Sequence, residues 1–339
     1  MHISLFFVIV TLLLSACAPA YRNVPHFGQT NSSAKAESLK EPYEFSYRSF
    51  PENLIINELP WEETEKYLVF DAKTSCLEFT YYRSKLPGKK KTVILLPIYS
   101  RKKLHELLPL FLASYLTVWN PNADFNLIFI KGEASHDPFD LDLLTEVDSE
   151  QKIIDWIKES AKRFREIVGC LRAVLDWAES QDSIDIKRVG IVGFSTSASI
   201  AIVAAGVDRR IAATVFFAGG VNFHHILAQA TEPRIKRIRK IMRKNKDFWE
   251  NFLKTAASIY EPLEPLSHAT KLNPAKTLYF DAEFDEYISK PIREEFWHVS
   301  GKPERVIFYS GHRESFLSLT PLGFYWADRK IIDFLRKKL

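Results

Sequence analysis

Two patterns of hydrophobic and polar residues divide the chain. From residue 43 to residue 86, aromatic and β-branched residues alternate with polar ones, as in Phe45–Phe50 and Leu77–Tyr81. Alternation with a period of two is typical of strands with one buried face, so we expect antiparallel strands at one edge of a sheet. The dipeptide Pro87–Gly88 then predicts a turn.

After this turn the expected strands are continuously apolar. Such runs suit parallel strands that are buried on both faces. Helical segments separate them, which predicts right-handed βαβ crossovers. The six expected strands are Thr92–Pro97, Asn126–Ile130, Val189–Gly193, Ile211–Ala218, Thr277–Phe280 and Val306–Tyr309.

Apolar residues recur at helical spacing from Ser149 to Ser180, which predicts the longest helix. Asp148 and Ser149 both suit its N-cap position. A second helical region separates the strand that ends near Gly220 from the strand that begins at Thr277. The pattern as a whole predicts an α/β fold, with a mostly parallel central sheet flanked by helices.

The N-terminus has a different pattern. The apolar run Ile3–Leu14 is too short for a comfortable membrane span, and the small residues Ser15 and Ala16 follow it directly. An apolar stretch that leads into small residues is typical of a secretory signal. We therefore expect residues 1–16 to be a signal peptide.

A cysteine follows the expected cleavage site. Leu-Ser-Ala before Cys17 resembles the lipobox of bacterial lipoproteins, in which the cysteine is lipidated and becomes the new N-terminus. The segment before the apolar run departs from that pattern, because it contains His2 and no Lys or Arg. The alternative is an ordinary signal peptide cleaved near Ala18 or Ala20. The resemblance implies a bacterial cell-envelope protein, lipid-anchored to a membrane at its periplasmic or extracellular face.

Residues 17–42 show no hydrophobic periodicity and are rich in Ala, Asn, Ser, Lys and Glu. We expect them to form a flexible tether between a lipid on Cys17 and a folded domain at residues 43–339. The domain is globular by composition, with 46% hydrophobic and 26% charged residues in the whole chain.

The stretch Gly193–Ser197 contains a serine that is a candidate for catalysis. It follows an apolar strand and opens the run of small residues Ala198–Ala205, which indicates a strand, a sharp turn and a helix, with Ser195 at the turn. The N-terminus of a helix behind that serine favours developing negative charge. Downstream, Asp285 follows an apolar run and His312 stands in Ser-Gly-His.

The chain order Ser, Asp, His is that of the α/β-hydrolases. We therefore note that residues from about 43 onward resemble α/β-hydrolase-fold serine hydrolases of the dienelactone-hydrolase and esterase type. The resemblance implies the α/β-hydrolase fold with a helical cap at about residues 222–270. One departure lies at Ser197, where the usual G-x-S-x-G turn ends in glycine. The alternative is a structural serine in a strand-to-helix turn.

Acyl transfer by a serine needs a base, a group that orients the base, and donors for the oxyanion. We expect Ser195 to be the nucleophile and His312 the base. Leu278–Asp285 resembles the strand-then-G-x-x-D loop of dienelactone-hydrolase-like proteins, which favours Asp285 as the acid. Asp281 and Glu283 are alternatives within the same loop.

The oxyanion donors are expected to be the backbone N–H groups of Thr196 and Tyr99. Many relatives have His-Gly in the second loop, where this chain has Pro97-Ile98-Tyr99. This departure leaves an alternative function: a catalytically silent α/β-hydrolase-fold lipoprotein that serves envelope binding or assembly. His224 and His225 follow a Gly-Gly pair and are candidates to line a pocket.

The segment Arg234–Lys246 contains eight basic residues and no acidic one, in a chain of net charge +4. Ile235, Ile238, Ile241 and Met242 form an apolar stripe along it. It is either a solvated helix packed on that stripe or a cap surface that contacts anionic lipid or an anionic substrate. A nucleic-acid partner does not suit an exported lipoprotein.

Two cysteines remain besides Cys17. Cys76 lies in an expected strand and Cys170 in the long helix, so a disulfide and two buried thiols are both open. Neither lies near His or Asp at a spacing typical of metal ligation, and we expect no metal site and no cofactor. The expected substrate is a small molecule with an acyl group.

Overall fold

A computed structural model describes residues 20–24, 55–63, 66–74, 77–99, 103–117, 122–132, 137–140, 149–220, 223–320, 323 and 325–339. The expected signal peptide, Cys17, Cys76 and the expected strand Phe45–Phe50 lie outside these residues. Within the described residues, no helix is long and apolar enough to cross a membrane.

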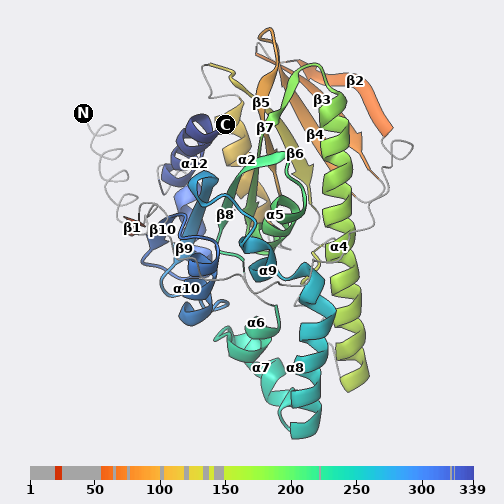
Figure 1. The fold of residues 1–339 in the computed structure, drawn as a ribbon, viewed down its shortest axis with the longest axis vertical. Coiled ribbons are helices and arrows are strands. Elements are labelled where there is room, and N and C mark those ends of the chain that lie inside the picture. Colours follow the sequence, from red (N-terminus) through yellow and green to blue (C-terminus); the bar gives the residue numbers. More distant parts are fainter. Residues whose placement is uncertain are drawn as a thin grey trace, which may run out of the picture.

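Ten strands form one sheet in the order β1-β10-β9-β8-β7-β5-β6-β4-β3-β2 (Figure 1). From β10 to β6 all neighbours are parallel, and the pairs on either side of this block are antiparallel. The strands are β1 (Tyr21–Val24), β2 (Ile55–Glu63), β3 (Tyr67–Lys73), β4 (Glu78–Ser84), β5 (Lys90–Leu95), β6 (Phe125–Lys131), β7 (Ile184–Phe194), β8 (Ile211–Phe217), β9 (Thr277–Ala282) and β10 (Glu304–Phe308).

The sheet confirms the expected α/β fold. The continuously apolar strands form the parallel centre, and the alternating strands β3 and β4 lie antiparallel towards one edge. Successive side chains of a central strand point to opposite faces of the sheet. In β5, for example, Ile94 joins one apolar cluster, while Val93 and Leu95 join the other.

Helices cover both faces of the sheet. The helices α4 and α5 pack on the face that contains Ile94, and α2 and α12 pack on the face that contains Val93. The helices are α2 (Lys103–Leu116), α4 (Glu150–Ser180), α5 (Thr196–Val207), α6 (Phe223–Gln229), α7 (Pro233–Met242), α8 (Lys246–Tyr260), α9 (Pro265–Ala269), α10 (Lys290–Val299), α11 (His312–Ser315) and α12 (Trp326–Lys338), with short 3-10 turns at Glu261–Leu263, Pro274–Lys276 and Phe316–Leu319.

The longest helix begins where its sequence indicates. Ser149 is the N-cap of α4, and its side chain accepts a hydrogen bond from the Lys152 N–H. Asp148, the other candidate cap, lies outside the described residues. The buried side of the helix carries the periodic apolar residues, such as Ile157, Phe164 and Leu171.

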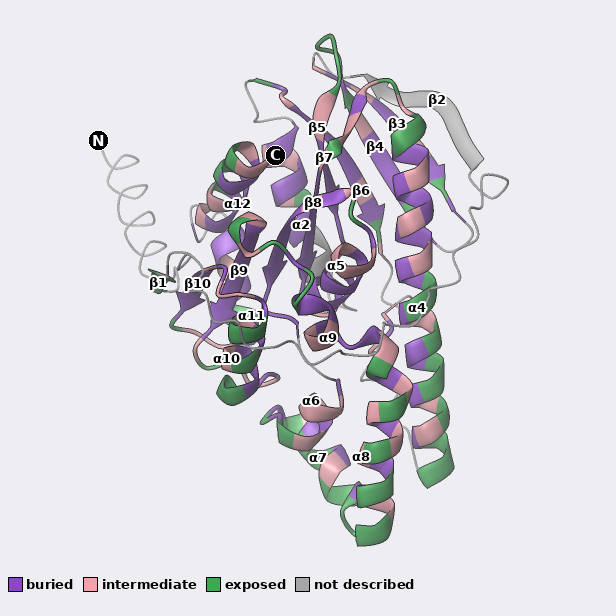
Figure 2. Cartoon of the chain, in the orientation of Figure 1, coloured by how far each residue is buried: buried purple, intermediate pink, exposed green. Residues whose placement is uncertain are grey.

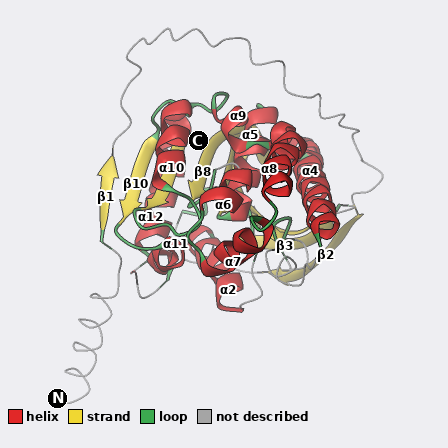
Figure 3. Ribbon diagram, turned by 90° about the horizontal axis from the view of Figure 1, so that it is seen from below, coloured by secondary structure: helices red, strands yellow, loops and turns green. Residues whose placement is uncertain are grey.

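The helices α6–α9 occupy residues 223–269, the segment in which a cap was expected. Figures 1 and 3 show α6 and α7 beyond the carboxyl ends of the parallel strands, with α8 beside α4. The residues at the outer ends of α4, α7 and α8 are exposed, whereas the central sheet is buried (Figure 2). The buried Tyr260 hydroxyl of α8 donates a hydrogen bond to Ser160 of α4.

One short strand lies inside the segment 17–42, which we expected to be a tether. Tyr21–Val24 forms β1 and pairs antiparallel with β10. The Tyr21 ring packs on the Trp326 ring, with 3.9 Å between centroids, and edge-on against Phe308. A flexible tether is therefore the wrong description for these four residues. Their pairing partner lies far away in the sequence, so local periodicity could not predict it.

Candidate active site

Ser195 lies in a sharp turn between β7 and α5. Its backbone has φ 51° and ψ −118°, a conformation that non-glycine residues rarely adopt. The Ser195 N–H donates a hydrogen bond to the Phe217 carbonyl at 2.8 Å. The turn also needs two glycines: a Cβ at Gly193 would lie 2.4 Å from the Ser197 carbonyl oxygen, and one at Gly219 would lie 2.6 Å from the Ser195 carbonyl oxygen.

Ser197 occupies the position that is usually glycine. Its side chain is fully buried and turns back onto Phe194. The Ser197 Oγ accepts from the Phe194 N–H at 2.8 Å and donates to the Phe194 carbonyl at 3.0 Å. The extra hydroxymethyl group therefore bonds to the strand end that leads into the turn, which explains how the turn accommodates it.

The three residues expected to form a triad are brought together. The Ser195 Oγ lies 2.9 Å from His312 Nε2, and His312 Nδ1 lies 2.7 Å from Asp285 Oδ2. With its proton on Nδ1, His312 donates to Asp285 and accepts the Ser195 hydroxyl proton at Nε2. His312 and Asp285 are buried, and Ser195 is half-buried. The arrangement fits a nucleophile, a base and a carboxylate that orients the base.

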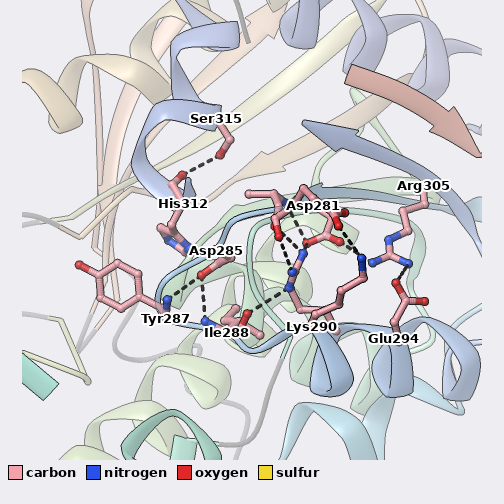
Figure 4. Close-up of polar contacts among 12 residues, drawn as sticks. Asp281, Asp285, Tyr287, Ile288, Lys290, Glu294, Arg305, His312 and Ser315 are labelled. Carbon is pink, nitrogen blue, oxygen red and sulfur yellow. Dashed lines mark hydrogen bonds and ion pairs between the residues drawn. The ribbon is translucent and has the colours of Figure 1, made fainter. Parts of the chain in front are cut away.

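Asp285 belongs to a loop that we call the acid loop, residues 283–288. Its second oxygen, Oδ1, accepts the N–H groups of Tyr287 and Ile288, each at 2.8 Å (Figure 4). The Asp285 N–H donates to the Ala282 carbonyl at 3.2 Å. Because both carboxylate oxygens are engaged, the side chain has a fixed orientation towards His312.

Asp281, the first alternative acid, has different partners. Its side chain is fully buried and bonds to two guanidinium groups. Asp281 Oδ1 accepts from Arg293 at 2.7 Å, and Oδ2 accepts from Arg305. The other alternative, Glu283, forms an ion pair with Lys290 at the surface. His312 pairs instead with Asp285, which lies between His312 and the loop backbone in Figure 4.

Arg293 also binds the acid loop, a role that the sequence did not indicate. Its Nε donates to the Ile288 carbonyl at 3.0 Å, and its Nη2 donates to the Glu283 carbonyl at 3.0 Å. Its Nη1 donates to both Asp281 and the Ala282 carbonyl. One buried guanidinium thus holds both ends of the loop. The only sequence signal is an arginine on the apolar side of α10, between the buried Ile292 and Phe296.

Glu286 and Tyr287 join the acid loop to its neighbours. The Glu286 carboxylate accepts the His312 N–H at 2.9 Å, and the Glu286 carbonyl accepts the N–H groups of Thr231 and Glu232 at the start of α7. The Tyr287 ring lies 4.8 Å from the His312 ring, and its hydroxyl accepts from Arg234 of α7. The base and the expected cap therefore contact the same loop.

Opposing effects act on the pKa of His312. Burial alone would lower it, since it disfavours the charged imidazolium. The negative charge of Asp285 and its hydrogen bond act in the opposite direction and prevail, so the pKa of His312 is raised above its ordinary value. The carboxylate therefore stabilises the imidazolium that would form during proton transfer.

The two expected oxyanion donors come from segments that follow neighbouring strands, β7 and β5. Thr196 is the first residue of α5, directly after Ser195. Tyr99 follows β5, which is the parallel neighbour of β7, and the Leu96 N–H continues this pairing by donating to Val192. The backbone from Pro97 to Tyr99 thus extends from the strand beside the one that carries Ser195.

The two candidate pocket histidines lie on α6. Burial and the neighbouring His225 lower the pKa of His224 to about 4, and burial lowers that of His225. His224 Nδ1 lies 3.9 Å from Glu264 Oε2. Among the described residues, no group of three or more His, Cys, Asp or Glu side chains is arranged to hold a metal ion.

A family comparison matches part of the chain. Residues 127–240, about a third of the sequence, match the model of the Dienelactone hydrolase family. This range includes Ser195 and ends within α7. No curated protein sequence matches the chain.

Solved structures share the fold at low identity. An acetyl xylan esterase from Paenibacillus sp. R4 has a TM-score of 0.58 and 14% identity, over 96% of this chain and 98% of that one. Acetyl Xylan Esterase 1 from Thermoanaerobacterium sp. JW/SL YS485 has a TM-score of 0.54 and 14% identity, over 78% and 87% of the two chains. The chain has the fold of these α/β-hydrolases. This fold and the family match together support an enzyme of the hydrolase class.

The contacts of the two aspartates predict separate effects. Asp285→Asn should lower kcat by about 10⁴, because an amide no longer fixes the His312 tautomer. Asp281→Asn should instead lower the free energy of unfolding by about 3 kcal/mol, because it removes the buried carboxylate that pairs with both the Arg293 and the Arg305 guanidinium groups. Urea denaturation and ester turnover of both purified variants check this. An Asp281→Asn protein of normal stability and abolished turnover would contradict the assignment.

Proposed function

We propose that the chain is a serine hydrolase that cleaves carboxylic ester or related acyl bonds through an acyl-enzyme. The observation that carries the proposal is the continuous set of hydrogen bonds from Ser195 Oγ through His312 to Asp285. The strained turn supports it further, because it places Ser195 directly before the N-terminus of α5. Two structural neighbours are named acetyl xylan esterases, so carboxylic esters are the first substrates to test.

In the proposed reaction, Ser195 Oγ attacks the carbonyl carbon while His312 Nε2 takes the hydroxyl proton. The backbone N–H groups of Thr196 and Tyr99 are proposed to stabilise the resulting oxyanion. The intermediate collapses, the bond from carbonyl carbon to the leaving oxygen breaks, and His312 returns the proton to that oxygen. A water molecule, deprotonated by His312, then attacks the acyl-enzyme and releases the acid and free Ser195.

We also propose that the chain is anchored to a bacterial envelope membrane through a lipid on Cys17. The sequence pattern before Cys17 supports this. The disulfide-bonded state of Cys170 is consistent with it, because disulfides persist in oxidising compartments outside the cytosol. The other two cysteines, Cys17 and Cys76, lie outside the described residues.

The basic segment Arg234–Lys246 supports a proposed contact with anionic lipid. Ile235, Ile238 and Met242 of the apolar stripe are buried, and Ile241 is exposed, so the stripe packs only in part as expected. Six basic residues of the segment are exposed: Lys236, Arg237, Lys240, Arg243, Lys244 and Lys246. The half-buried Arg234 and Arg239 bond to groups of the protein instead.

Replacement of the nucleophile tests the reaction. Ser195→Ala should lower ester turnover by about 10⁴–10⁶ and abolish labelling by a fluorophosphonate probe, with an unchanged free energy of unfolding. Ser199→Ala, in the helix that follows Ser195, is a matched control and should keep both ester turnover and probe labelling. A wild-type protein that the probe does not label would favour the catalytically silent alternative.

The dependence of the rate on pH tests His312. The base must be neutral to accept a proton, so kcat/KM should rise with pH through a pKa above about 6.5, the ordinary value of histidine, and then level off. In Asp285→Asn the midpoint of the residual activity should move to lower pH, because the charge that raises the pKa is removed. An unchanged midpoint in that variant would contradict the proposed role of Asp285.

The anchor is tested by Cys17→Ser. This change should release most of the chain from bacterial membranes or leave it as an uncleaved precursor, whereas the wild type sediments with membranes and its N-terminal peptide carries the mass of the lipid. If α7 contributes, any residual sedimentation should be greater with anionic than with neutral vesicles and should fall at high salt. A wild-type N-terminal peptide without lipid would disprove the anchor.

A further inference from the structure

Three exposed aromatic side chains come from adjacent segments at one corner of the sheet. Phe284, Tyr309 and Tyr21 have exposed fractions of 66%, 47% and 44%. The Phe284 N–H donates to the Ser310 carbonyl at 3.0 Å, and the Tyr309 N–H donates to the Ala20 carbonyl at 2.6 Å. Backbone hydrogen bonds thus connect the three segments. We call these three residues the aromatic corner.

The aromatic corner lies beside the candidate catalytic groups. Phe284 directly precedes Asp285 in the acid loop, and Tyr309 precedes His312 by three residues. Tyr21 is paired with Phe308, the last residue of β10. All three aromatic residues therefore lie at the carboxyl ends of β9 and β10, the edge of the sheet at which Asp285 and His312 lie.

The backbone of the aromatic corner is firmly held. Arg293 binds the Ala282 and Glu283 carbonyls directly before Phe284. The Tyr21 ring is packed on Trp326, so the part that is exposed has a fixed position. Little conformational entropy is therefore lost when these side chains enter an apolar environment. Tyrosine suits a bilayer surface in particular, because its ring is apolar and its hydroxyl remains hydrated.

The distance along the chain to Cys17 limits what can cover this corner. Ala20 is the third residue after Cys17, and a fully extended chain spans at most about 3.6 Å per residue, or about 11 Å over these three steps. A lipid on Cys17 would therefore hold Ala20, whose carbonyl bonds to Tyr309 of the aromatic corner, within about 11 Å of the lipidated residue. The exposed Arg22 of β1 adds a positive charge at the same edge.

We infer that the aromatic corner docks on the bilayer that holds the Cys17 lipid. Phe284 and Tyr309 enter the headgroup region, and the loops that carry Asp285 and His312 face the membrane surface. The enzyme then acts on esters that are presented at the bilayer, such as amphiphilic molecules with an accessible acyl group. This inference rests on the lipid anchor proposed above, and the ester specificity rests on the proposed hydrolase activity.

The test uses the full chain produced in a bacterium and reconstituted in phosphatidylcholine vesicles that contain a photoreactive diazirine phosphatidylcholine. After illumination, peptide mass spectrometry compares lipid adducts at Phe284 and Tyr309 with adducts at Leu86. Leu86 is a matched control, because it has an exposed fraction of 48% and lies in the turn before β5, at the opposite end of the sheet. Adducts at the aromatic corner should exceed those at Leu86 by about tenfold, the population shift expected from burying one aromatic ring.

A double variant, Phe284→Ser with Tyr309→Ser, keeps the lipid on Cys17 but should reduce adducts at the aromatic corner by about tenfold, whereas Leu86→Ser should leave those adducts unchanged. Equal labelling of the corner and Leu86 in the wild type would overturn the inference. The same result is expected if a protein, rather than the bilayer, covers this corner. The mass of the N-terminal peptide reports the anchor separately. Fluorophosphonate labelling of Ser195 in the same vesicles reports both folding and the proposed hydrolase activity.

Discussion

The buried contacts of Arg293 determine the shape of the loop on which the candidate site depends. Asp281 and Arg293 are both taken out of water, which costs free energy that their attraction alone need not recover. The guanidinium recovers more by donating to three backbone carbonyls: that of Ala282 at the end of β9 and those of Glu283 and Ile288 in the acid loop. Buried backbone carbonyls need such hydrogen-bond donors. The ion pair therefore serves to fix the loop that presents Asp285.

The serine turn is fixed by a different constraint, which is lack of space. The backbone of Ser195 has a positive φ, and such strain persists only where the surroundings enforce it. Here the close approach of α5 to β7 and to the end of β8 enforces it, and glycine at 193 and 219 permits that approach. Ser197 contributes in its own way, through two hydrogen bonds to Phe194 that a glycine could not make. A departure from the usual motif thus supports the same geometry.

These two constraints explain what the sequence could predict. The central strands, α4 and the serine turn follow from local patterns, because apolar periodicity and small residues act over a few positions. The choice between Asp281 and Asp285 does not, since the first lies near the end of β9 and the second just after that strand. The two carboxylates are told apart by distant partners: Arg305 for Asp281 and His312 for Asp285. The strand β1 was missed for the same reason. Four residues have too little periodicity, and their position depends on Trp326 and β10.

The acid loop also connects regions that the chain keeps apart. Its Glu286 carbonyl binds the start of α7, and its Tyr287 hydroxyl accepts from Arg234 of α7. Its Phe284 belongs to the aromatic corner at the opposite end of the loop. A displacement of α7 or of the β1 edge would therefore act on the backbone that orients Asp285, and through it on His312. Arg293 opposes such a displacement, because its guanidinium group bonds to carbonyls at both ends of this loop.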